Sequence, residues 1–213
     1  MIVEHRGAAP RIADDVYVAP NAVVSGDVEI GAGSRILFGA VLTAEGGPVR
    51  IGERCVVMEN AVVRGRTGYP TTVGDNVLIG PHAHVNGARV GENAFVATGA
   101  AIFPGARVGD RATVRIGGVL HVNSRLPDDQ FVPIGWVAVG DPAKVLPPDR
   151  HDEIWAIQKR LDFPGTVFGV ARAGNGESHM PQAMARYSRW LGEHLGDRVL
   201  EGDPGPPGDG TAG

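Results

Sequence analysis

A six-residue repeat of aliphatic residues runs from Ile12 to Leu120 and is interrupted only three times. A small residue usually follows each aliphatic one four positions later. A helix cannot hold residues six apart on one face, because six residues turn through about 600°. An extended chain that bends every six residues can. The repeat therefore predicts a solenoid whose stacked coils bury a shared core. The repeating residues are Ile12, Val18, Val24, Ile30, Ile36, Leu42, Ile51, Val57, Val63, Val73, Ile79, Val85, Val90, Val96, Ile102, Val108, Val114 and Leu120.

Three such hexads close one triangular coil, with glycine, asparagine and aspartate at the corners, where they tolerate a positive φ. The hexads up to Leu120 predict about six coils and an all-β solenoid domain over residues 1–148. The repeat is expected to stop after Leu120, so that residues 121–148 form a final irregular coil. Parallel sheets are then expected on the three flat sides of the prism.

The chain after the solenoid changes character. Residues 149–200 predict a C-terminal helical segment that packs on the solenoid, with one helix carrying the apolar stripe Ile154, Ile157 and Leu161. A second helix is expected from about Pro181 to Leu195. Residues 201–213 are rich in glycine and proline and are expected to be a disordered tail.

Composition narrows the choice of partners and compartment. The net charge of −4 over 213 residues argues against nucleic acid and against an anionic membrane as the main partner. No apolar run is long enough for a transmembrane helix, and the N-terminus lacks the apolar stretch of a signal peptide, so a cytoplasmic location is expected. Cys55 is the only cysteine. It falls on a small inward position and is expected to be a buried thiol.

Four segments resemble the γ-class carbonic anhydrases, a family of hexapeptide-repeat proteins. They are Phe38 to Gly52, Val57 to Arg64, Ile79 to Gly87 and Val139 to Lys144, and the resemblance covers roughly residues 10 to 147. It implies a left-handed parallel β-helix, a homotrimer, and a metal site bound by three histidines at a subunit boundary.

The residues at the three ligand positions do not carry that chemistry over. The resemblance places Arg64, Pro81 and Asn86 where the family has its histidines. Proline has no ligand atom, arginine stays cationic, and an asparagine amide is a poor zinc ligand. The family's Arg-Gly-Asp is Thr43-Ala44-Glu45 here, and Met58 replaces a glutamine. No metal is therefore expected at the family positions, and efficient CO2 hydration is not expected.

A different polar set stands near the vacated site. His82, His84 and Asn86 alternate with inward residues and are expected to face outward together. Arg64 and Arg66 lie 18 residues before the two histidines, which predicts that they are neighbours one coil away. We expect an inter-subunit pocket in which arginine repulsion keeps a histidine neutral near pH 7. The alternative is a purely structural role, in which these side chains form a hydrogen-bonded trimer interface.

The residues of this pocket divide into candidate catalytic and candidate substrate-binding groups. His84, His82, Asn86 and Arg64 are the candidate catalytic residues, with His84 preferred as the base. The candidate substrate-binding residues are Arg64, Arg66 and Glu59, which suit a small anionic molecule. A weaker alternative is a zinc or other divalent metal site made from His82, His84 and His121, within one chain or across subunits.

Three function classes stay open from the sequence. One is a divergent γ-carbonic anhydrase-like enzyme that acts on a small anionic substrate. Another is a coenzyme A-dependent acyltransferase, and the third is a non-catalytic assembly subunit. Glu45 and Glu59 are expected to form salt bridges with Arg50, Arg64 or Arg66 rather than to act as acids or bases. Structural or idle roles are expected for the remaining histidines, His5, His151, His179 and His194.

Overall fold

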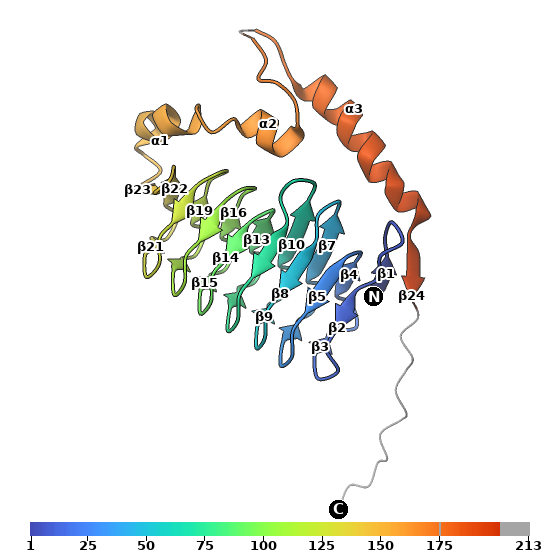
Figure 1. The fold of residues 1–213 in the computed structure, drawn as a ribbon. Helices are drawn as coiled ribbons and strands as arrows, with labels where there is room; N and C mark the ends of the chain where they lie inside the picture. Colours follow the sequence, from blue (N-terminus) through green and yellow to red (C-terminus); the bar gives the residue numbers. More distant parts are fainter. Residues whose placement is uncertain (175, 201–213) are drawn as a thin grey trace, which may run out of the picture.

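The computed structural model describes residues 1–174 and 176–200, and its main body is a triangular β-solenoid (Figure 1). Three sheets run along the solenoid, and successive strands of the chain pass from one sheet to the next. The ten-stranded sheet holds eight parallel strands, β1 Ile2–Glu4, β4 Val23–Ser25, β7 Val41–Glu45, β10 Val62–Arg66, β13 His84–Asn86, β16 Ala101–Ile102, β19 Val119–Leu120 and β22 Val137–Val139, with β23 Lys144–Leu146 and β24 Arg198–Leu200 antiparallel at its two edges.

The other two sheets have seven parallel strands each and complete the prism. One contains β2 Arg11–Ile12, β5 Val28–Ile30, β8 Val49–Ile51, β11 Thr71–Val73, β14 Arg89–Val90, β17 Arg107–Val108 and β20 Arg125–Leu126. The other contains β3 Tyr17–Val18, β6 Arg35–Ile36, β9 Val56–Val57, β12 Leu78–Ile79, β15 Phe95–Val96, β18 Thr113–Val114 and β21 Phe131–Val132. The fold class predicted from the hexads is confirmed.

The solenoid is longer than the six coils expected, with about eight turns. The repeat does not stop at Leu120, because Leu126, Val132 and Ala138 continue it at the same spacing and are all fully or almost fully buried. Residues 121–139 form regular coils rather than one irregular coil. A further strand, β1, adds a turn before Ile12. The aliphatic period itself continues through Leu126 and Val132, but the small residue that usually follows four positions later is replaced by Gln130 and Trp136, and the prediction stopped the repeat too early.

The core is a column of aliphatic side chains in register. Leu42, Val63, Val85, Ile102 and Leu120 are stacked in consecutive strands of the ten-stranded sheet, and each has no exposed side-chain surface. Burial of one such side chain contributes about 1.5–3 kcal/mol. The expected buried thiol is present too, since Cys55 is 1% exposed and burial raises its pKa.

The C-terminal segment returns along the solenoid from its last coil to its first (Figure 1). It contains α1 His151–Gln158, α2 Phe163–Phe168, α3 Met180–Leu191, a 3-10 turn at Gly192–Gly196 and then β24, which pairs antiparallel with β1. Helices are present at both expected places, but α1 ends at Gln158, before Leu161 of the predicted stripe, and α3 ends at Leu191. Neither α2 nor β24 had a clear sequence signal. The predicted disorder of residues 201–213 falls outside the described part of the chain.

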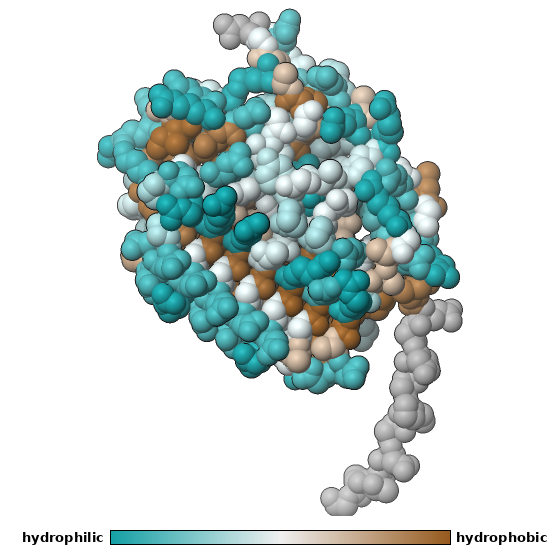
Figure 2. All heavy atoms as spheres, in the orientation of Figure 1, coloured by the Kyte–Doolittle hydropathy of each residue, from teal (hydrophilic) through white to brown (hydrophobic). Residues whose placement is uncertain are grey.

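The helices of this segment are mostly hydrophilic on the face seen in Figure 2. Ile154 of α1 packs against Val139 and Leu146 of the last coil, and Ala183 of α3 is fully buried. Across the described residues, no helix has the length and apolar character that crossing a membrane requires.

Candidate functional site

Three polar side chains form a row across the outer face of the ten-stranded sheet. Thr43, Arg64 and Asn86 are in register on the adjacent strands β7, β10 and β13. Thr43 and Asn86 are each 8% exposed. The hydroxyl of Thr43, Nε of Arg64 and Oδ1 of Asn86 are buried without a hydrogen-bond partner among the described residues. Unsatisfied buried polar groups cost about 1–3 kcal/mol each, so the row is suited to meeting a further molecule.

The register differs from the one expected for the arginines. Arg64 lies opposite Asn86, and His84 lies opposite Val62. The predicted offset of 18 residues is wrong here, because the loop between Arg66 and Thr71 lengthens this coil and moves both arginines relative to the histidines. Arg66 is therefore not beside His84.

His84 nevertheless has the expected electrostatic character. It is half-buried at the centre of the face, in line with Val62 and Ala101. Burial lowers its pKa, and the positive charge of Arg64 lowers it further. The predicted direction is confirmed, although desolvation contributes more than the arginine. His82 occupies an exposed corner with φ of 56°, and its amide donates to the carbonyl of Glu59 on the preceding coil at 2.9 Å.

His121 is separated from this group within one chain. The register places Phe103 between the strand positions of Asn86 and His121, and the ring of His121 lies 6.1 Å from that of Phe103 and 5.7 Å from that of Phe163. Burial lowers the pKa of His121, and its Nδ1 has no partner in the described chain. Within one chain, residues 1–174 and 176–200 do not gather the ligand atoms of His82, His84 and His121 into one group.

A cavity of about 490 Å³ lies between the solenoid and helices α2 and α3. Arg66 is at its inner wall, where it is 8% exposed and donates to the carbonyl of Val167 at 2.5 Å. Arg186 and Arg189 line the outer side, and neither forms an ion pair with any residue of the described ranges. The other lining side chains include Tyr69, Phe168, Tyr187, Trp190 and Glu193.

Comparison with known proteins agrees with this architecture. The family described as "Bacterial transferase hexapeptide (six repeats)" matches residues 9–44 and 70–104. Gamma carbonic anhydrase 2, mitochondrial, of Arabidopsis thaliana is 38% identical over 100 residues, which cover 44% of this chain and 36% of that protein. A probable carbonic anhydrase of Methanocaldococcus jannaschii is 36% identical over 91 residues, or 43% of this chain and 57% of that protein. Over these segments the chain is similar to hexapeptide-repeat proteins, among them γ-carbonic anhydrases.

Among solved structures, a putative acetyltransferase of Bacillus cereus is 25% identical and has a TM-score of 0.52. The alignment covers 76% of this chain and 92% of that chain. The matched segments span between 36% and 57% of the two carbonic anhydrase relatives. The interval between the two family matches, residues 45–69, lies in the longer coils that follow Leu42 and Val63, where the six-residue spacing is broken.

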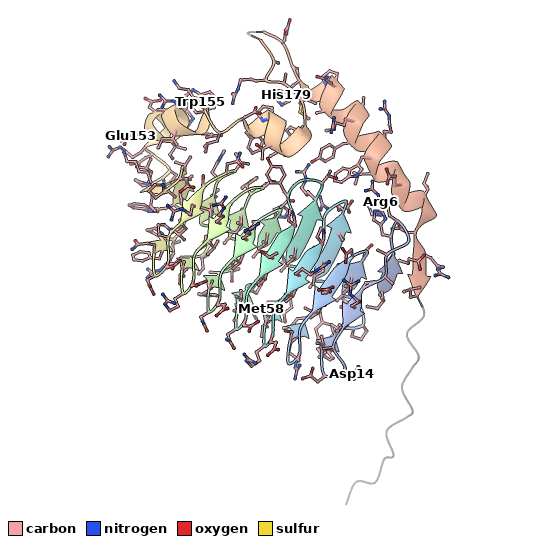
Figure 3. The ribbon with its side chains drawn as sticks, viewed as in Figure 1. Arg6, Asp14, Met58, Glu153, Trp155 and His179 are labelled. Carbon is pink, nitrogen blue, oxygen red and sulfur yellow. The ribbon has the colours of Figure 1, made fainter. Side chains whose placement is uncertain are left out.

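The three positions that correspond to the carbonic anhydrase ligands do not provide three metal donors. Arg64 and Asn86 do lie side by side, as two ligands of one site would. Pro81 stands at the corner before β13. A permanent cation and a side chain without a donor atom cannot complete a zinc site. Met58 lies at the edge of the solenoid away from the C-terminal helices (Figure 3). The residues present do not fit the family's metal.

Two histidines that the sequence left without a role do meet in space. One ligand atom from each of His5, Glu45 and His194 lies within 4.8 Å of the others. Glu45 contacts His194 rather than Arg50, which pairs with Asp27 and Glu29. No local signal could have joined His5 to His194, because they stand at opposite ends of the described chain.

Proposed function

We propose that this protein binds and acts on a small anionic molecule on the outer face of the ten-stranded sheet, and that it is not an efficient CO2 hydratase. The observation that carries the proposal is the cavity in which Arg66, Arg186 and Arg189 face a single lining carboxylate, that of Glu193. Glu193 is already paired with Arg6. The cavity therefore offers an excess of guanidinium donors, which suit carboxylate and phosphate groups.

The aromatic walls suggest what else the ligand carries. Tyr187 and Trp190 lie next to Arg66, with ring centroids 5.6 and 5.8 Å from its guanidinium carbon. Pockets of several hundred cubic ångströms with apolar walls and a few fixed polar groups are typical of small-molecule sites. We infer an organic anion with a planar or apolar body.

Direct binding measurements test this site. Isothermal titration with benzoate, inorganic phosphate and acetyl-coenzyme A would compare a carboxylate, a free anion and a large aromatic phosphate ester. Arg186→Ala and Arg189→Ala should each weaken binding of the preferred anion, since a charge-assisted hydrogen bond contributes about 1.5–3 kcal/mol. Arg107→Ala, an exposed arginine on another sheet, is the matched control. Wild-type affinity in both cavity variants would contradict the proposal.

Catalysis, in this proposal, depends on the row of Thr43, Arg64 and Asn86, in which Arg64 lies on the same strand, β10, as Arg66 of the cavity. His84 would act as the base, because burial and Arg64 keep its imidazole neutral near pH 7. Arg64 and Asn86 would orient the substrate with their unpartnered atoms. His82 and Glu59 would contribute from the adjacent corner. Once a turnover assay exists, His84→Ala and Arg64→Ala should each abolish turnover while leaving the far-UV spectrum unchanged.

The expectation that CO2 hydration is inefficient comes from the residues at the three family ligand positions. Without histidines at positions 64, 81 and 86, no metal there can lower the pKa of a bound water to about 7. Stopped-flow hydration should stay at the buffer background. A rate far above background that a chelator abolishes would refute this part of the proposal.

We also propose a homotrimer. Half-buried valines recur down the ten-stranded sheet, and Phe38, Ile116 and Ile134 are 51%, 53% and 63% exposed along the edge next to it. An apolar band crosses the solenoid face seen in Figure 2. Closed symmetry would bury such surface. Sedimentation should give three chains per particle, and a stable monomer at micromolar concentration would refute the trimer.

Acyl transfer from coenzyme A is the second candidate function. It is favoured by the overall likeness to the putative acetyltransferase of Bacillus cereus. Binding of acetyl-coenzyme A together with release of free thiol in the presence of an amine acceptor would support it over the first. If no anion binds at all, a non-catalytic assembly subunit becomes the better explanation.

A further inference from the structure

Four side chains from distant parts of the chain meet where the C-terminal segment returns to the first coils. His5 directly follows β1, Glu45 ends β7, His194 lies in the 3-10 turn after α3, and Asp197 precedes β24. The rings of His5 and His194 stack with centroids 4.4 Å apart. In Figure 3 this region is marked by Arg6, which lies beside the end of α3.

Asp197 holds both histidines by the same ring atom. Its Oδ1 lies 2.5 Å from Nδ1 of His5, and its Oδ2 lies 2.7 Å from Nδ1 of His194. A carboxylate on Nδ1 fixes the tautomer of an imidazole and leaves Nε2 as its lone-pair donor. One aspartate therefore prepares two histidines at once for the same role.

Glu45 supplies a third donor at a spacing that suits a metal. Both carboxylate oxygens of Glu45 lie 3.1 Å from Nε2 of His194. Two ligands of a tetrahedral zinc ion, each at about 2.0–2.2 Å, are about 3.3 Å apart. The ligand atoms of His5, Glu45 and His194 lie within 4.8 Å of one another, so small side-chain rotations would close the set on an ion.

Charge and access agree with a cation at this point. Glu45 is 5% exposed and His5 is 4% exposed, so a carboxylate and an imidazole are withdrawn from water here. With neutral histidines, the charges of Glu45 and Asp197 equal that of one divalent ion. A cavity of about 230 Å³ has His5 and Gly46 in its wall, which gives an ion or a water molecule a route to the cluster.

We propose that His5, Glu45 and His194 bind a zinc ion, with Asp197 orienting the two histidines. The site uses none of the positions 64, 81 and 86, and it does not depend on the proposed anion cavity. Two imidazoles and one carboxylate are borderline donors that zinc accepts, with a fourth position left for water. His5 follows β1, Glu45 ends β7 and His194 lies in the 3-10 turn after α3. A bound ion would therefore hold the C-terminal segment against the first coils.

Metal analysis of the 213-residue chain tests the site. Purified protein is loaded with Zn²⁺, desalted and assayed for bound zinc, and its affinity is measured by competition with a chromophoric chelator. About one zinc per chain is expected for the wild type, and loss of stoichiometric binding for His194→Ala and for His5→Ala. Asp197→Asn should weaken binding about 10- to 100-fold. His151→Ala, on an exposed histidine, is the matched control and should bind as the wild type does.

Two further measurements keep the result interpretable. His194 is partly exposed, so His194→Ala is expected to fold, and far-UV circular dichroism of the metal-free protein checks this. Zinc should raise the thermal midpoint of the wild type and leave that of His194→Ala unchanged. Substoichiometric zinc in the loaded wild type, or wild-type zinc content in both histidine variants, would overturn the proposal and leave a hydrogen-bonded cluster in its place.

Discussion

Arg66 connects the solenoid to the C-terminal helices, and its replacement by methionine should loosen that junction. Its guanidinium donates to the carbonyl of Val167 and lies over the rings of Tyr187 and Trp190. Methionine keeps the apolar stem but removes the charge and all five donors. The substitution therefore separates the electrostatic contacts of Arg66 from its packing.

The size of the effect follows from these contacts. A hydrogen bond from a charged group contributes about 1.5–3 kcal/mol, and a partly desolvated cation–π contact about 0.5–2 kcal/mol. The carbonyl of Val167 also accepts from the hydroxyl of Tyr187 at 2.9 Å, so it is not orphaned when Arg66 is lost. Removal of a buried charge also recovers part of its desolvation cost. We expect Arg66→Met to lower the free energy that holds α2 and α3 on the solenoid by about 2 kcal/mol.

Hydrogen exchange and urea denaturation distinguish local from global loss. Amides of α2 and α3 should exchange about 30-fold faster in Arg66→Met, which is the factor that 2 kcal/mol corresponds to. Amides in the central coils should change little. Arg107→Met, on an exposed strand of a different sheet, is the control. Unchanged exchange in α2 and α3 would refute the idea that Arg66 anchors them, whatever its part in binding an anion.

Three other predictions concern the solenoid itself. The contributions of His84 and His121 to stability should fall as the pH is lowered through about 6.5, because burial lowers their pKa values in the folded state and the unfolded chain takes up these protons first. His194 acts in the opposite direction, because its hydrogen bond to Asp197 raises its pKa. In urea titrations at about pH 7.5 and about pH 5.5, His121→Phe should therefore lose less stability on acidification than the wild type does. Leu126→Ala should lower the free energy of unfolding by about 2–5 kcal/mol in the same assay, since Leu126 is 1% exposed in the coils after Leu120. A change near zero would mean that these coils are not part of the cooperative core. Gly65→Ala should lower the free energy of unfolding by more than about 3 kcal/mol, because the added Cβ would stand 2.2 Å from the carbonyl oxygen of Gly47. Gly192→Ala, where the added Cβ meets open space, should be neutral, and equal thermal midpoints for the two variants would contradict this.

The six-residue period was enough to predict the solenoid, because the direction of each side chain in an extended coil depends only on its place in the repeat. It also gave the inward residues and the outward position of His84. The coil length around Arg64 was readable too, since Val63 and Val85 are 22 residues apart, but the fixed offset of 18 hid it. The extra coils were readable from Leu126 and Val132, although Gln130 and Trp136 break the pattern of small residues there.

The tertiary structure alone decided where the C-terminal segment lies. Packing of α2 and α3 over the ten-stranded sheet turns Arg66 from a surface residue into the wall of a cavity, and pairing of β24 with β1 sets the direction of the chain end. The meeting of His5 with Asp197, which are 192 positions apart, follows from that pairing. A local repeat contains no information about such a contact. The contact depends on the path of the C-terminal segment, which does not repeat and which connects the last coil of the solenoid to the first.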